Sequence, residues 1–110
     1  MPASSQPEER EPTRAEIDQT TGPVLLEFGA TWCGYCQGLA PHLAAALNEF
    51  PAVRHIKIED GKGKPLGRSF RVKLWPTLVF LRDGQVVEQL VRPEASALRP
   101  PLEAITSPNS

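Results

Sequence analysis

Residues 24–50 constrain the fold most strongly, because they join a strand pattern to a helix pattern through the chain's only two cysteines, Cys33 and Cys36. Residues 24–28 form a short apolar run of β-forming residues, which is typical of a buried strand. Beyond the cysteines, apolar residues recur at spacings of three and four, which predicts a helix. We expect this helix to begin at or just after Cys33 and to be kinked near Pro41. A buried strand therefore leads to two thiols in the first turn of a helix.

The spacing of Cys33 and Cys36 suits thiol–disulfide exchange. At a helix start, unpaired backbone N–H groups and the helix dipole favour the thiolate form of a cysteine, and the thiolate is the nucleophile. Positions i and i+3 share a helix face, so the second sulfur can attack a mixed disulfide formed at the first. We expect Cys33 to be the attacking, more exposed thiol and Cys36 to be the buried, resolving thiol.

Two other uses of the cysteine pair stay open at this point. A structural disulfide across so short a loop would contribute little stability, since the chain-entropy effect grows with loop length. Zinc normally takes four protein ligands, and the two histidines, His42 and His55, lack the close spacing of a zinc finger. A zinc site shared between two chains is the remaining metal alternative. We expect no metal and no organic cofactor.

The charge balance argues against two classes of partner. The 110 residues carry a formal net charge of −1, with both signs spread along the chain. This pattern predicts neither a nucleic-acid binder nor a membrane anchor. We expect a monomer whose partners are proteins or small molecules.

The length and composition predict one domain with a tail at each end. Residues 1–12 are rich in Pro, Ser, Glu and Arg, so we expect a disordered tail there. The domain is predicted at residues 13–106, and a second disordered tail at 107–110. No apolar stretch of a signal peptide precedes the domain, which predicts a cytoplasmic location. The periplasm is the alternative if a signal peptide has been removed.

Local patterns place the remaining elements. They predict helices at residues 14–20, 66–70 and 94–105, and strands at residues 53–59, 77–81 and 85–91. Thr13 and Glu16 form a capping-box pattern. Asp83-Gly84 is a strong hairpin signal between the last two strands. Pro100-Pro101 must either break the last helix or begin a second turn. This order predicts the α/β class, with a central mixed sheet of about four strands and helices on both faces.

Four motifs of this sequence together resemble the motifs of one protein family. Trp32-Cys33-Gly34-Tyr35-Cys36, Pro41 five residues further on, Trp75-Pro76-Thr77 and Asp83-Gly84 fall at the spacings of thioredoxin, and the similarity covers about residues 22–90. The resemblance implies the thioredoxin fold and a thiol–disulfide oxidoreductase that acts on protein disulfides and takes electrons from a reductase. It also implies a cis peptide bond at Pro76, close to the cysteines and beside an extended substrate segment. The alternative for Pro76 is an ordinary first residue of a strand.

The resemblance further assigns a role to Glu27. It matches a carboxylate that the family buries beneath the second cysteine, where it can serve as acid or base for Cys36. The alternative is an edge carboxylate that points to water. His55 and Lys57 lie near the position at which the family carries a lysine close to this carboxylate. We expect both to be ordinary strand side chains.

The residues around the cysteines predict an altered substrate surface. In the family, the residues that match Trp32 and Gly34 belong to that surface. Tyr35 replaces a proline of the family, and this replacement predicts a redox centre more oxidising than that of thioredoxin. Trp75 and Arg92 replace smaller residues beside the substrate groove.

Gly29 stands where thioredoxin commonly has tryptophan. These departures leave a second function open, a binding or assembly module that holds one protein partner and uses the cysteines as a redox-sensitive latch.

Overall fold

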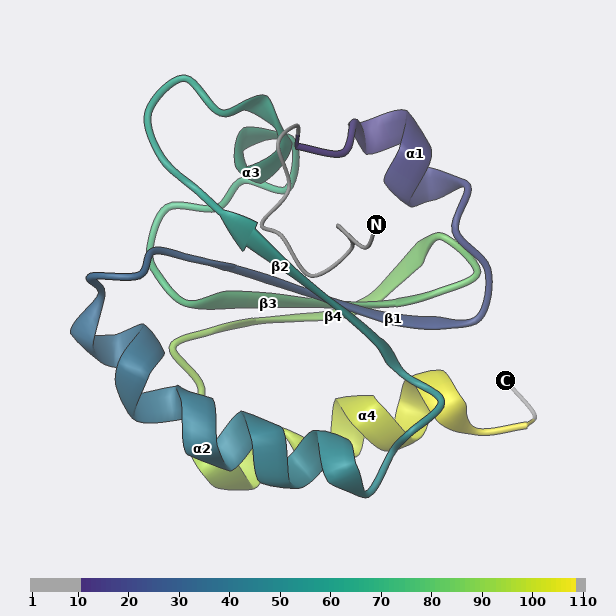
Figure 1. The fold of residues 1–110 in the computed structure, drawn as a ribbon. Helices are drawn as coiled ribbons and strands as arrows, with labels where there is room; N and C mark the ends of the chain where they lie inside the picture. Colours follow the sequence, from purple (N-terminus) through teal and green to yellow (C-terminus); the bar gives the residue numbers. More distant parts are fainter. Residues whose placement is uncertain (1–10, 109–110) are drawn as a thin grey trace, which may run out of the picture.

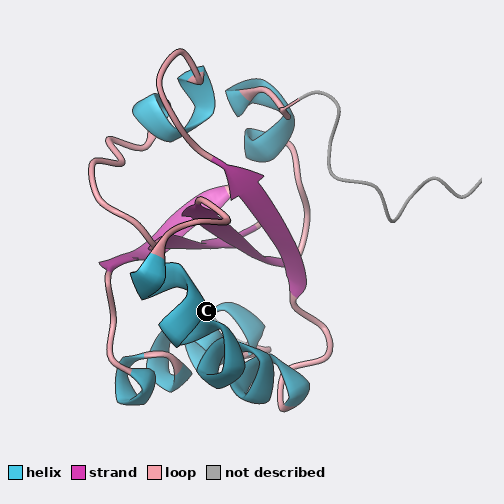
Figure 2. Ribbon diagram, turned by 60° about the vertical axis from the view of Figure 1, so that its left-hand side comes forward, coloured by secondary structure: helices cyan, strands magenta, loops and turns pink. Residues whose placement is uncertain are grey.

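The computed structural model describes residues 11–108 and contains a four-stranded mixed sheet with helices on both faces (Figures 1 and 2). Its strands are β1 (Pro23–Gly29), β2 (Arg54–Glu59), β3 (Thr77–Arg82) and β4 (Gln85–Val91), in the order β2-β1-β3-β4. Strand β1 pairs parallel with β2 and antiparallel with β3, and β3 pairs antiparallel with β4. The predicted fold class is confirmed.

The predicted tails at 1–12 and 107–110 fall mostly on residues 1–10 and 109–110, which lie outside the described residues. At the N-terminal boundary, the backbone N–H of Leu66 donates to the carboxylate of Glu11 at 2.7 Å. None of the helices in residues 11–108 has the length and apolar character of a membrane span.

The helices divide into two pairs, one on each face of the sheet (Figure 1). Helices α1 (Arg14–Asp18) and α3 (Pro65–Ser69) lie on one side, and α2 (Gly34–Asn48) and α4 (Arg99–Thr106) lie on the other. The predicted capping box at the start of α1 is present, with both of its reciprocal hydrogen bonds.

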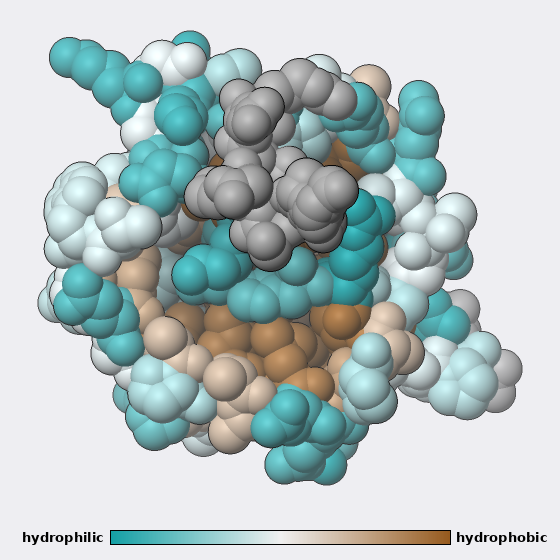
Figure 3. Space-filling model, viewed as in Figure 1, coloured by the Kyte–Doolittle hydropathy of each residue, from teal (hydrophilic) through white to brown (hydrophobic). Residues whose placement is uncertain are grey.

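Alternation along β1 explains why two separate cores form. Val24, Leu26 and Phe28 pack into the core beneath α1 and α3, whereas Leu25 packs into the core beneath α2 and α4. Each fully buried side chain of this size stabilises the fold by about 1.5–3 kcal/mol. Glu27 shares the face of Leu25 and therefore lies toward α2. Figure 3 shows the apolar side chains of this second core between strand β2 and helix α2.

The predicted hairpin is present, whereas the predicted last helix is divided in two. Asp83 and Gly84 join β3 to β4 with φ values of 52° and 79°, the left-handed conformation that a tight hairpin requires. The single helix predicted at 94–105 is instead divided into a 3₁₀ turn, Ala95–Ala97, and α4. The paired prolines lie in the first turn of α4. The N–H groups of a first turn have no hydrogen-bond partner within the helix, so a proline there removes no helical hydrogen bond.

Candidate active site

Cys33 occupies the position at which helix α2 begins. It is the N-cap residue, with extended backbone angles, and its Sγ accepts a hydrogen bond from the backbone N–H of Cys36 at 3.2 Å. The strand β1 places it there, since only four residues separate the strand's last residue from the first residue of α2. The N–H groups and the dipole at this helix end stabilise negative charge on the sulfur of Cys33.

The relative exposure of the two cysteines differs from the sequence prediction, which was wrong on this point. Cys33 is 7% exposed, whereas Cys36 is only partly buried. The side chain of Cys33 folds back over the first turn to accept the N–H of Cys36, which hides its sulfur. Gly29, which lies against Cys36, has no side chain to cover it, and a Cβ added there would come within 2.7 Å of Cys36 Sγ.

The electrostatic difference between the cysteines favours the predicted roles in spite of their exposure. The pKa of the Cys36 thiol is raised to about 11, first because burial disfavours its thiolate and then because of its hydrogen bond with Cys33. Repulsion from Cys33 and from Glu27 raises this pKa further. Cys36 therefore keeps its proton at neutral pH.

A cavity of about 480 Å³ lies on the side of Cys36 that faces β1 and β2. Glu27, Gly29, Cys36 and Lys57 are among the residues that line it. Because Glu27 and Cys36 share this cavity, water inside it could connect the carboxylate with the thiol.

Glu27 is buried, as predicted, but its partner was not foreseen. The residue is 6% exposed, and Oε1 lies 2.7 Å from Nε2 of His55 on the neighbouring strand. The prediction that His55 is an ordinary strand side chain was therefore wrong. Ile56 packs against the opposite core, so alternation along β2 turns His55 to the face of Glu27. That alternation was the signal in the sequence that could have revealed the pair.

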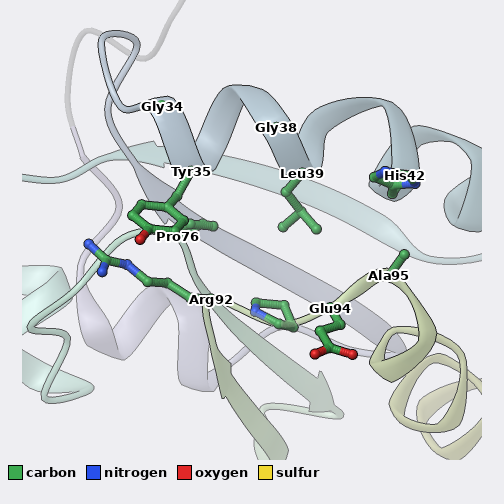
Figure 4. A pocket seen from close by; sticks show the side chains of 10 residues that line it. Gly34, Tyr35, Gly38, Leu39, His42, Pro76, Arg92, Glu94 and Ala95 are labelled. Carbon is green, nitrogen blue, oxygen red and sulfur yellow. The ribbon is translucent and has the colours of Figure 1, made fainter.

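A second cavity, of about 640 Å³, runs along the other side of the helix start. Gly34, Tyr35, Pro76 and Arg92 are among the residues that line it, and they come from α2, from the start of β3 and from the loop after β4 (Figure 4). The Trp75–Pro76 peptide bond is cis, as the resemblance implied. The sequence thus predicted four residues that meet in one groove. His42 also lines it.

Tyr35 and Arg92 line this groove, and Trp75, which Arg92 contacts, pairs with Trp32 beside it. Trp32 is 71% exposed and lies edge-on to Trp75, with ring centroids 5.3 Å apart. The guanidinium of Arg92 lies 4.0 Å from the centroid of the Tyr35 ring, and its Nε donates to the carbonyl of Trp75 at 2.8 Å. Asp60 accepts from the indole N–H of Trp75 at 2.9 Å. Figure 4 shows Arg92 beside the Tyr35 ring.

Within residues 11–108 there is no cluster of three or more His, Cys, Asp or Glu side chains that could hold a metal ion. Cys33 and Cys36 are both free thiols in this structure. The geometry can support nucleophilic attack by one sulfur and later attack by the other on it.

Comparisons with known proteins match the chain to one family and to solved structures of similar fold. A family model described as Thioredoxin matches residues 6–103. Thioredoxin 2 from Pseudomonas aeruginosa PAO1, solved in its reduced form, is 50% identical with a TM-score of 0.80 over 93% of this chain and 95% of that chain.

Two curated fungal proteins are also similar. "Thioredoxin-2" of Pyricularia oryzae is 33% identical over 86 residues, which are 78% of this chain and 48% of that protein. "Thioredoxin Asp f 28" of Aspergillus fumigatus is 33% identical over 72 residues, which are 66% of this chain and 67% of that protein. The chain thus spans about half to two thirds of the length of these relatives. The family match covers most of the chain, and the cysteine pair and the cis-proline lie inside it, so the chain belongs to the thioredoxin family.

Proposed function

We propose that this protein is a thiol–disulfide oxidoreductase that acts on protein disulfides, with Cys33 as nucleophile and Cys36 as resolving thiol. The observation that carries the proposal is the contrast between the two sulfurs. Cys33 Sγ accepts a backbone N–H at the start of α2, whereas burial holds the pKa of Cys36 at about 11. One sulfur is prepared for attack and the other is kept as a thiol until it is needed.

The reaction has two steps. In the first, the thiolate of Cys33 forms a bond with one sulfur of the substrate disulfide, and the other substrate sulfur leaves as a thiolate and takes up a proton. In the second, Cys36 loses its proton and attacks Cys33, so the bond to the substrate breaks and the Cys33–Cys36 disulfide forms. Two electrons pass from the dithiol to the substrate. The thiols themselves carry the electrons, so the proposed chemistry requires no metal or organic cofactor.

Glu27 is proposed as the base for the second step. It is buried on the face of the sheet toward α2 and lines the same cavity as Cys36. Glu27→Gln should slow release of the substrate by about 100-fold, the lower end of general acid–base catalysis, with little effect on the first attack. A pH–rate profile of this variant that matches the wild type would remove Glu27 from the mechanism.

The groove beside Pro76 is proposed as the substrate site. Trp32, Tyr35, Trp75 and Arg92 would contact an extended segment of the substrate, and Gly34 leaves its backbone open to it. A reductase would return the disulfide to the dithiol, which makes the protein part of electron transport and of cell redox homeostasis. We propose that it acts as a monomer in the cytoplasm, where a reducing environment suits a chain with only two cysteines.

Reduction of insulin disulfides by wild type and by Cys33→Ser tests the proposal. We expect turnover by the wild type in the presence of dithiothreitol and none above background by the variant. A competent dithiol without turnover would instead favour the binding or assembly module, which the comparisons do not favour.

A further inference from the structure

The contact between Glu27 and His55 links a buried acid to a group that reaches water. The side chain of Glu27 is 8% exposed and that of His55 is 29% exposed, and their oxygen and nitrogen lie 2.7 Å apart. Histidine changes charge between about pH 5 and pH 8, so a buried carboxylate in contact with it experiences two electrostatic states in that range.

We propose that His55 is a positioning residue for the resolving step, which holds Glu27 toward the Cys36 cavity and sets its strength as a base through its own charge. This inference rests on the proposed roles of Glu27 and Cys36. Neutral His55 donates its Nε2–H to Oε1 of Glu27, and the other carboxylate oxygen accepts the proton of Cys36. The freed thiolate forms the bond to Cys33, and the substrate sulfur leaves and is protonated by water.

The charge of His55 changes the basicity of Glu27 in a definite direction. An imidazolium beside the carboxylate stabilises its ionised form, so the carboxylate takes the proton from Cys36 less readily. As the pH rises and the imidazole becomes neutral, Glu27 becomes the stronger base. The resolving step should therefore gain rate across this range beyond the gain due to the thiol itself.

Other charged groups near the pair act on the same carboxylate. Lys57 is the register partner of Glu27 on β2 and lines the cavity. Cys36 faces it from α2, and the remaining ionisable groups around the cavity are Glu11, Glu59 and Lys64. Glutamate and lysine side chains in general keep one charge between pH 5.5 and pH 8, whereas histidine is the side chain type that changes its charge there. This difference lets the contribution of His55 be separated from theirs.

The test uses the reduced full chain in excess over 5,5′-dithiobis(2-nitrobenzoate), with release of the coloured thiolate followed by stopped flow at pH 5.5 and pH 8. Attack by Cys33 releases the first thiolate, and attack by Cys36 on the resulting mixed disulfide releases the second. Cys36→Ser should lose the second phase and Cys33→Ser the first. If either control fails, the proposed function fails, independently of His55.

His55→Lys and His55→Gln separate charge from hydrogen bonding. Lysine keeps a positive charge at both pH values, so the second phase of His55→Lys should match the wild type within about twofold at pH 5.5 and be about tenfold slower at pH 8. Glutamine donates a hydrogen bond without a charge, so His55→Gln should remain within about twofold of the wild type at pH 8.

The matched control is Lys57→Gln, because Lys57 lies on the same strand as His55 and lines the cavity that Glu27 shares with Cys36. Its second phase should keep the wild-type dependence on pH. A merely structural role for His55 would slow His55→Lys equally at both pH values, and that result would overturn the proposal. Wild-type rates in His55→Lys at pH 8 would overturn it as well. So would loss of the pH dependence in Lys57→Gln.

Discussion

At the scale of single residues, the two cysteine sulfurs have different electrostatic surroundings although they lie one helical turn apart. The backbone N–H of Cys36 stabilises charge on Cys33, whereas the thiol of Cys36 loses solvation on burial and faces the charges of Cys33 and Glu27. Solvent exposure alone would favour Cys36 over Cys33 as the nucleophile, because Cys36 is the more exposed of the two. The proposed assignment of Cys33 as the nucleophile therefore rests on local electrostatics rather than on exposure.

Alkylation with iodoacetamide should reveal this difference. Because the pKa of Cys36 is raised to about 11, its thiolate should be scarce at pH 7 and become common only as the pH approaches that value. Peptide mapping by mass spectrometry after brief treatment at pH 7 should find the label on Cys33 alone, and treatment near pH 11 should label both. Equal labelling at pH 7 would contradict the assignment.

At the scale of elements, the apolar strands and the hairpin were predictable because their signals are local. Residues 24–28, 53–59, 77–81 and 85–91 were expected as strands, and each observed strand agrees within two residues at either end. The C-terminal helix was harder, because prolines both end and begin helices. Contact between the hairpin and α1 was not predictable, since it depends on how distant elements pack.

Gly84 lies at the contact between the hairpin and α1. Its φ is +79°, and a Cβ added there would lie 2.0 Å from the backbone oxygen of Asp18. Gly84→Ala should therefore combine backbone strain with overlap against a second element and lower the free energy of unfolding by about 3 kcal/mol or more, as measured by urea denaturation.

Gly63 provides the matched control for this substitution. It has the same φ of +79°, but nothing lies within 4 Å of an added Cβ. Gly63→Ala should cost only the left-handed conformation, about 1–2 kcal/mol. Equal losses in the two variants would show that the contact with α1 is unimportant.

At the scale of the whole molecule, the sheet brings together residues that lie far apart in the sequence. The cysteines, the buried carboxylate and the cis-proline were predictable, because each carries a family motif or follows directly from one. The hydrogen bond between Glu27 and His55 was predictable only in part: alternation along β2 turns His55 to the face of Glu27, but the contact also requires the register between β1 and β2 and the reach of two side chains across it. The relative exposure of the cysteines was missed for a similar reason, since it depends on the absent side chain of Gly29.

The reduction potential is a property of this whole arrangement. Tyr35 leaves a backbone N–H at the helix start that a proline would remove, and additional stabilisation of the Cys33 thiolate favours the dithiol over the disulfide. We expect a potential less negative than the value of about −270 mV for thioredoxin. Titration against glutathione buffers would measure it, and Tyr35→Pro should shift it back toward that value. A wild-type potential at or below about −270 mV would contradict this expectation.

Trapping of the mixed disulfide tests the central claim, that Cys33 captures the substrate and Cys36 releases it. Cys36→Ser and Cys33→Ser, each in reduced form, would be incubated with insulin and analysed by mass spectrometry without reductant. The account predicts that Cys36→Ser accumulates a covalent adduct with an insulin chain through Cys33 and that Cys33→Ser accumulates none. An adduct of equal yield through Cys36 in Cys33→Ser, or none in Cys36→Ser, would contradict it.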